Sequence, residues 1–208
     1  AAKFGADINI AGMLHGKMLT SPHAHARILS INTTKAESIP GVKAVITALD
    51  FPIFETQKDI DFFAEQFRGA RIMAEHFMAR EKVLYVGHPI AAIAAVSPHI
   101  AEEAASLIEV EYEILPAVLT IEDALKNDAP LVHDKLTTVL RDRPNGKEDS
   151  GTKSNVAGHG QLMRGDIEKG FKEAQVIVEH EFSTQAVHPG YIEPFASTAQ
   201  WQRDGHVT

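Results

Sequence analysis

The chain has 208 residues, with 20 basic and 28 acidic side chains and a formal net charge of −8. A surface of that sign repels phosphate backbones, and because no basic run is longer than two residues, nucleic acid is excluded as a partner. No apolar stretch approaches the roughly 18 residues of a membrane span. The absence of cysteine excludes disulfides, thiolate zinc sites and iron–sulfur ligation within this stretch.

Strands and one short helix are predicted in the first part of the chain. Alternating or β-branched residues favour strands at three places, namely residues 13–19, 26–31 and 42–47. Thr34 and Glu37 have the spacing of a capping box, in which a hydroxyl and a carboxylate each satisfy a free amide at the start of a helix. Pro40-Gly41 is expected to end that helix.

A second apolar block begins near residue 83. It predicts a strand over 83–86 and a buried strand over 90–96, followed by a helix that begins at Ser97-Pro98, with a hydroxyl N-cap and proline in the first turn. Residues 108–114 alternate apolar and acidic side chains, as in a half-buried strand. Residues 51–80 carry most of the phenylalanines and are interpreted as an insertion with some helix.

The last third of the chain is more polar at first. Residues 134–160, with Asn145-Gly146 and several glycines, are typical of a linker. Beyond them the pattern predicts a helix capped by Asp166 and ending near Ala174, a strand over 176–184, a second strand reaching residue 202, and a turn at Asp204-Gly205. The whole order of elements predicts an α+β (mixed α/β) fold.

Two groups of side chains suggest cation binding, each with a simpler explanation. His23 and His25 are two apart, so on a strand both imidazoles face one way and are able to share a zinc ion, but no spacing marks a third ligand. Glu109, Glu111 and Glu113 line up three carboxylates, which more often form the solvated side of a sheet. We therefore predict no metal ligand here.

The segment 188–194 concentrates unusual residues after a predicted strand. A histidine, a glycine, a tyrosine and a glutamate lie between two prolines or next to them. Such a concentration suits the wall of a binding site. It suits an irregular connection between strands equally well, and the residues alone leave both interpretations open.

Nine short segments, in chain order, carry a resemblance to a known family. They are 3–8 (KFGADI), 12–16 (GMLHG), 21–28 (SPHAHARI), 40–45 (PGVKAV), 85–91 (YVGHPIA), 101–105 (AEEAA), 110–116 (VEYEILP), 164–168 (RGDIE) and 188–194 (HPGYIEP). Together they resemble the large subunit of the xanthine dehydrogenase, aldehyde oxidase and aerobic carbon monoxide dehydrogenase family. The resemblance implies an α/β-hammerhead domain over 1–133, a linker over 134–160, and the truncated start of a molybdopterin-binding domain over 161–208.

The resemblance also implies a chemistry. In the family, molybdenum is held by the dithiolene of a pterin cofactor, and substrates such as heterocycles, aldehydes or carbon monoxide are oxidised with water as the oxygen source. Electrons leave through iron–sulfur and FAD subunits or domains. The glutamate that acts as base lies beyond residue 208, so no catalytic residue is expected here and Glu193 is not that base. The cofactor-adjacent candidates are Gln185, His188, Gly190 and Tyr191.

The chain itself is expected to be a piece of the cytoplasmic enzyme, inactive alone and without bound cofactor. Its expected partners are the rest of the large subunit, the iron–sulfur and FAD components and, in the full enzyme, a small-molecule substrate. Apolar surface that normally meets the rest of the subunit favours self-association. Two alternatives stay open: a free-standing hammerhead module that binds a ligand or protein without catalysis, and a metal protein that uses His23 and His25.

Overall fold

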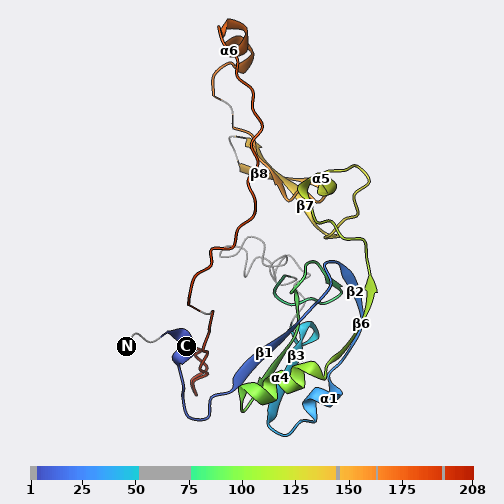
Figure 1. The fold of residues 1–208 in the computed structure, drawn as a ribbon, viewed down its shortest axis with the longest axis vertical. Coiled ribbons are helices and arrows are strands. Elements are labelled where there is room, and N and C mark those ends of the chain that lie inside the picture. The colour runs from blue at the N-terminus through green and yellow to red at the C-terminus, as the bar shows by residue number, and fades with distance from the viewer. Residues whose placement is uncertain (1–3, 52–75, 144–145, 163, 194) are drawn as a thin grey trace. The chain divides into compact units, whose positions relative to one another are not determined.

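The computed structural model describes residues 4–51, 76–143, 146–162, 164–193 and 195–208 (Figure 1). Its chain divides into two compact units. The larger unit is Leu14–Leu162, and the smaller one combines Ala1–Met13 with Met163–Thr208. Most of the Phe-rich insertion predicted at 51–80 lies outside the described residues.

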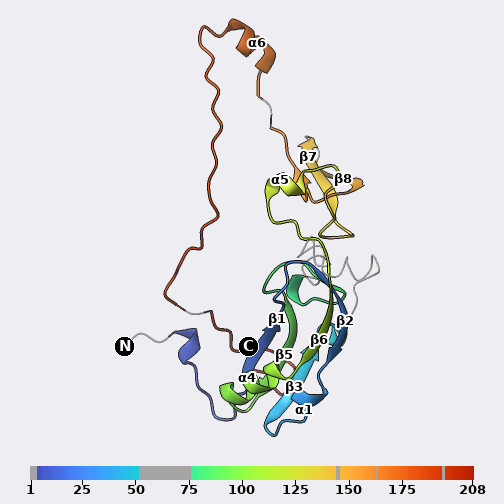
Figure 2. The same ribbon diagram turned by 45° about the vertical axis from the view of Figure 1, so that its right-hand side comes forward.

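The first sheet of the larger unit has its most buried strand in the middle. Its order is β1-β5-β3, with β1 (His15–Thr20), β5 (Pro89–Ala95) and β3 (Val42–Thr47) antiparallel to their neighbours (Figure 2). Ala91 pairs with Leu19 on one side and Thr47 on the other. The apolar run that predicts a buried strand is therefore confirmed, because both of its edges are hydrogen-bonded.

A second sheet has the order β4-β2-β6. Its strands β2 and β6 are labelled in Figure 2. It consists of β4 (Lys82–Val83), β2 (Ala26–Asn32) and β6 (Glu109–Ile114), all antiparallel. Ala26 and Val83 are fully buried and pair directly, with Ile90 packed in the same cluster. On β6 the glutamates are exposed and Val110 and Tyr112 are partly buried, as the acidic alternation predicts.

Helix α4 (Pro98–Ser106) covers the β1-β5-β3 sheet together with the short α1 (Thr34–Glu37). Ser97 caps α4 as predicted, since its hydroxyl accepts the Ile100 amide at 3.3 Å. Helix α1 is also confirmed, but its N-cap is Thr33, whose hydroxyl donates to the Glu37 carboxylate at 2.6 Å. The core beneath both helices consists of small and branched residues, namely Ala36, Ala91, Ile93, Ala104, Ala105 and Ile108.

Gly41 joins α1 to β3 in a conformation that only glycine adopts easily. Its φ is +100°, and a Cβ there would lie 2.9 Å from Ile100 Cδ1. Gly41 therefore lets the chain turn directly against α4. A short 3-10 turn, η2 (Ala48–Asp50), follows β3 and is closed by Thr47 and Asp50, whose side chains bond to backbone amides.

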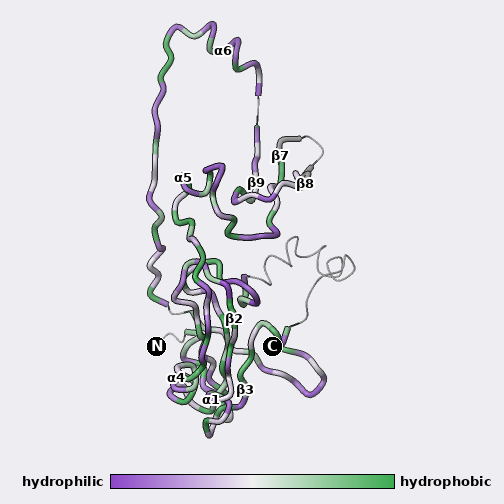
Figure 3. Tube along the Cα trace, turned by 90° about the vertical axis from the view of Figure 1, so that its right-hand side faces the viewer, coloured by the Kyte–Doolittle hydropathy of each residue, from purple (hydrophilic) through white to green (hydrophobic). Residues whose placement is uncertain are grey.

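Residues 116–162 form a third, smaller arrangement in the larger unit. After α5 (Ile121–Ala124) come β7 (Thr137–Arg143), β8 (Gly146–Lys153) and β9 (Gly158–His159), in the order β8-β7-β9 (Figure 3). The polar composition of 134–160 predicts a linker, whereas the structure has strands there. A polar, glycine-containing hairpin has the same composition as a linker, so composition does not separate them.

The smaller unit has little regular structure. It contains the 3-10 turn η1 (Gly5–Asp7) and α6 (Ile167–Glu173), which Asp166 caps through the Lys169 amide at 2.9 Å, as predicted. The strand predicted over 176–184 is wrong, because the described part of 174–199 has no strand pairing. Of the second predicted strand, only residues 200–202 pair, with residues 206–208. Hydrophobic and hydrophilic residues still alternate along the described part of 174–199 (Figure 3). The turn at Asp204-Gly205 is confirmed by the Trp201–Val207 bridge.

The mixture of helices and antiparallel or mixed sheets confirms the predicted α+β fold class. Within the described ranges, no helix has both the length and the apolar character required to cross a membrane.

Candidate functional site

Three of the four candidate cofactor-adjacent residues form one small turn. The His188 imidazole accepts a hydrogen bond from the Gly190 amide through Nδ1 at 3.0 Å, and the ring centroids of His188 and Tyr191 are 5.7 Å apart. Gly190 has a φ of +65°, a conformation that glycine adopts easily. Tyr191 also meets Phe195 edge to face at 4.7 Å. The turn therefore presents an imidazole and a phenol together.

Gln185 and this turn lie on the same exposed stretch. Gln185, His188 and Gly190 are all exposed, and Tyr191 is 44% exposed. The polar side chains that the segment offers between Glu181 and Glu193 include those of Gln185, His188 and Tyr191.

The same stretch exposes large apolar side chains that globular proteins normally bury. They are Val176 (78%), Val178 (72%), Phe182 (86%), Val187 (85%), Ile192 (98%) and Phe195 (89%). Large apolar side chains exposed in this way along one stretch are typical of a segment that packs on a partner surface.

The His-x-His pair does not behave as a metal site. His25 is 4% exposed and its Nδ1 lies 2.7 Å from the Pro116 carbonyl oxygen, which orients the ring toward the strand β6 end. His23 meets Tyr112 edge to face at 4.9 Å. Across the ranges that the structure describes, no three His, Asp or Glu side chains gather closely enough to hold a metal ion.

The acidic ladder of β6 is matched across the sheet. Glu109 pairs with Lys35, Glu111 accepts from the Ser30 hydroxyl at 3.4 Å, and Glu113 lies 3.6 Å from Arg27. These partners all come from β2 or α1. The ladder is therefore the solvated side of a sheet, as the simpler explanation predicts.

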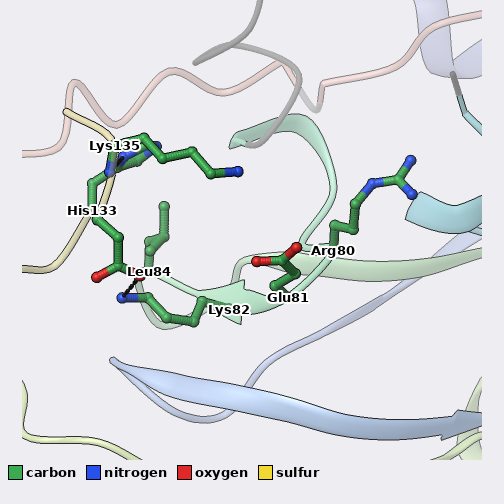
Figure 4. Close-up of a pocket in the computed structure, with 7 residues that line it drawn as sticks. Arg80, Glu81, Lys82, Leu84, His133 and Lys135 are labelled. Atoms are coloured by element: carbon green, nitrogen blue, oxygen red, sulfur yellow. Dashed lines mark hydrogen bonds and ion pairs between the residues drawn. The ribbon is translucent and has the colours of Figure 1, made fainter. Parts of the chain in front are cut away.

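A small pocket is formed by residues that the sequence patterns do not single out. It measures about 70 Å³ and is lined by Arg80, Glu81, Lys82, Leu84, His133, Asp134 and Lys135 (Figure 4). Small-molecule sites generally measure several hundred Å³, so this pocket is too small for an organic substrate.

Ionic and hydrogen-bonding contacts tie this pocket together. Lys82, whose side chain is only 13% exposed, forms an ion pair with Asp134 at 2.9 Å (Figure 4). The hydrogen bond from Lys82 lowers the pKa of Asp134 below its ordinary value, and partial burial opposes this. Arg80 donates to the carbonyl oxygens of Ala48 and Phe51, the latter at 2.7 Å. The ion pair between Lys82 and Asp134 joins residues 133–135 to the β4 region. His88 is fully buried beside β4. The sequence feature that could have drawn attention to it is its position in Gly87-His88-Pro89, between two apolar segments.

The architecture is that of a hammerhead-type α+β domain followed by a segment that lacks a core of its own. The family described as "Aldehyde oxidase and xanthine dehydrogenase, a/b hammerhead domain" matches residues 1–116, and the family described as "Molybdopterin cofactor-binding domain" matches residues 148–208. The chain belongs to the aldehyde oxidase and xanthine dehydrogenase family, which confirms the resemblance carried by the nine segments. The domain boundaries at 133 and 161 stay predictions.

Curated relatives align with most of this chain. The gamma subunit of the 6-hydroxypseudooxynicotine dehydrogenase complex of Paenarthrobacter nicotinovorans is 34% identical over 96% of the chain, which spans 23% of that protein. The nicotinate dehydrogenase large molybdopterin subunit of Eubacterium barkeri is 30% identical, with 100% and 42% covered. The carbon monoxide dehydrogenase large chain of Afipia carboxidovorans is 32% identical, with 90% and 22% covered. The chain thus spans less than half the length of each.

Solved structures give the same result. A Cu,Mo-CO dehydrogenase in its carbon monoxide-reduced state matches with a TM-score of 0.56 and 30% identity, covering 84% of this chain and 20% of that one. Reconstituted CO dehydrogenase from Oligotropha carboxidovorans matches with a TM-score of 0.51 and 34% identity, covering 65% and 16%.

Proposed function

We propose that the chain supplies the hammerhead domain and the first part of the cofactor-binding domain to the large subunit of a molybdenum hydroxylase. The whole polypeptide would be an oxidoreductase that oxidises a small organic molecule or carbon monoxide and takes its oxygen from water. One observation carries this proposal: a hammerhead family and a molybdopterin-binding family match the same chain one after the other.

In this proposal, residues 185–191 contribute one wall of the cofactor site. These residues suit the cofactor by their chemistry, because the amide of Gln185, the ring of His188 and the phenol of Tyr191 can donate hydrogen bonds. Gly190 lies between His188 and Tyr191, whose rings are close to each other. The molybdenum cofactor, when bound, supplies the redox chemistry. The chain's own residues orient and enclose it. Glu193 has no part as a base.

The chain alone is proposed to be inactive and free of cofactor. The exposed apolar residues of 176–195 need a surface to pack on, and the rest of the large subunit supplies it. Iron–sulfur and FAD subunits or domains are proposed as the electron-transfer partners, in keeping with a relative named as one subunit of a dehydrogenase complex. A cytoplasmic location is part of the same proposal.

The test compares the 208-residue chain with the complete gene product that contains it. Both are purified from the same molybdate-supplemented host, and molybdenum and pterin are measured per polypeptide. We expect stoichiometric cofactor in the complete product and none in the chain. Gln185→Ala in the complete product is expected to lower cofactor content, whereas His99→Ala, on the exposed side of α4, is expected to leave it unchanged.

Two outcomes would overturn the proposal. One is stoichiometric cofactor, or turnover of a substrate, in the 208-residue chain. The other is a complete gene product that ends near residue 208 and binds a ligand or protein without any molybdenum, which would favour the free-standing module.

A further inference from the structure

The N-terminal turn η1 lies against a residue near the other end of the chain. It precedes the hammerhead strands and falls within the match to the hammerhead family at residues 1–116, yet it belongs to the smaller unit together with Met163–Thr208. Gly5 is partly buried, and a Cβ on it would lie 3.7 Å from both the Cβ and the carbonyl oxygen of Ala196. This is ordinary van der Waals distance, so the position of Gly5 faces Ala196 directly.

The shape of η1 is fixed by hydrogen bonds of its own. The Phe4 amide donates to Asp7 Oδ2 at 2.9 Å, and the Asp7 amide donates back to the Phe4 carbonyl oxygen at 3.0 Å. The Ile8 amide donates to the Gly5 carbonyl oxygen at 3.3 Å. These bonds satisfy the backbone of the turn locally, so η1 keeps its shape without pairing to a sheet.

Ala196 is connected to the candidate cofactor wall through two contacts between rings. Its neighbour Phe195 meets Tyr191 edge to face, with 4.7 Å between the ring centroids. The Tyr191 ring lies 5.7 Å from that of His188, whose Nδ1 accepts the Gly190 amide at 3.0 Å. A displacement of Ala196 therefore passes to the phenol and then to the imidazole.

The segment that carries this wall needs support from outside itself. The described part of 174–199 has no strand pairing, so its order must come from packing rather than from a sheet. After it, the hairpin at 200–208 is closed by two backbone hydrogen bonds between Gln200 and Thr208, at 2.8 and 3.0 Å. The hairpin holds the segment after Ala196, and η1 meets Ala196 itself.

We propose that η1 is the support on which residues 188–196 rest, with Gly5 and Asp7 as positioning residues for the candidate cofactor wall. Gly5 allows Ala196 to approach, and Asp7 holds the turn closed. Both act through Ala196, so residues 4–7 are needed for cofactor retention. The cofactor part of this inference rests on the proposed function, whereas the packing of η1 on Ala196 is testable without any cofactor.

The first experiment measures that packing with engineered cysteines in the 208-residue chain, which has no cysteine of its own. Disulfide Cβ atoms lie about 3.8 Å apart, so Gly5→Cys/Ala196→Cys has the required spacing. The matched control is Gly170→Cys/Ala196→Cys, because a Cβ on Gly170 in α6 meets nothing within 4 Å. Disulfide formation under mild oxidation is followed on non-reducing gels.

The two cysteine pairs are expected to change order on unfolding. In native buffer, Gly5→Cys/Ala196→Cys should oxidise faster than the control pair, because its Cβ atoms are already in contact. In concentrated urea it should oxidise about twentyfold more slowly, because it closes a loop of about 190 residues instead of about 26. Oxidation of the Gly5→Cys pair that is no faster than the control in native buffer would refute the proposal.

The second experiment measures molybdenum and pterin per polypeptide in the complete gene product. Gly5→Trp places a large ring where a Cβ already meets Ala196, and should lower cofactor content to below about half, whereas Gly5→Ala should retain it. Asp7→Ala should also lower it, and Asp7→Asn, which keeps an oxygen to accept the Phe4 amide, should restore it. In the 208-residue chain, Gly5→Trp should keep the wild-type urea midpoint by circular dichroism, because Gly5 lies outside the larger unit.

Two results of this second experiment would also count against the support role. One is wild-type cofactor content in both Gly5→Trp and Asp7→Ala. The other is an equal loss in Asp7→Ala and Asp7→Asn, since the role of Asp7 depends on its accepting oxygen. A wild-type complete product without cofactor would instead refute the proposed function, and the cysteine pairs would still decide whether η1 supports Ala196.

Discussion

Truncating Ile93 at the centre of the first sheet should strongly destabilise the larger unit. Ile93 lies on the middle strand β5, is 2% exposed, and packs in a cluster otherwise rich in alanine. Ile93→Ala removes three carbon atoms, which at about 0.8 kcal/mol per buried methylene amounts to roughly 2.4 kcal/mol. A cavity adds to this, because alanine neighbours have no side-chain rotations with which to fill it. We expect a loss of about 3–4 kcal/mol.

Urea unfolding followed by far-ultraviolet circular dichroism measures this loss, because all of the regular strands belong to the larger unit. The single tryptophan, Trp201, lies in the smaller unit and does not report on β5. Ile93→Val should cost only about 1 kcal/mol. Ile192→Ala is the control, since Ile192 is 98% exposed. A loss below about 1 kcal/mol for Ile93→Ala, or an equal loss for Ile192→Ala, would refute this description of the core.

Two further predictions concern α4 and the pocket. Ser97→Ala removes the cap on the Ile100 amide and should lower the free energy of unfolding by about 1 kcal/mol, whereas Ser97→Asp should largely retain it; an unchanged urea midpoint in Ser97→Ala would contradict the cap. Because Lys82 holds the pKa of Asp134 below its ordinary value, this pair stabilises the fold above the unfolded-state pKa, and the contribution is lost as the pH falls through the lowered one. Asp134→Asn should therefore reduce the fall in urea midpoint between pH 5 and pH 3, and an identical acid profile would count against the pair.

The elements that the sequence predicts correctly are those set by local signals. The β-branched run at 42–47, the acidic alternation at 109–114 and the Ser97-Pro98 helix start each act within a few residues. Sheet order is different. In the arrangement β1-β5-β3, paired residues such as Leu19 and Ala91, or Thr47 and Ala91, are far apart in the chain, and no local pattern specifies which strand lies in the middle.

The candidate site was predictable only in part. The family resemblance singles out Gln185, His188, Gly190 and Tyr191, and the structure brings the last three together in one turn. The buried histidines were not predictable, because burial of a polar side chain depends on residues far away in the chain. His133, for example, is buried directly before the segment 134–160, whose composition resembles a linker.

The wrong prediction over 176–184 is itself informative about function. The alternation there has the strength of a real strand pattern, with Val176, Val178 and Phe182 on one side. A strand, unlike a helix, obtains its hydrogen bonds from a neighbour, and a segment with the pattern but no neighbour stays extended and exposes its apolar side. The pattern therefore indicates that residues 176–184 need a partner surface on which to pack. This is the same requirement that the proposed function places on residues 185–191, which become a cofactor wall only when the preceding stretch is held in place.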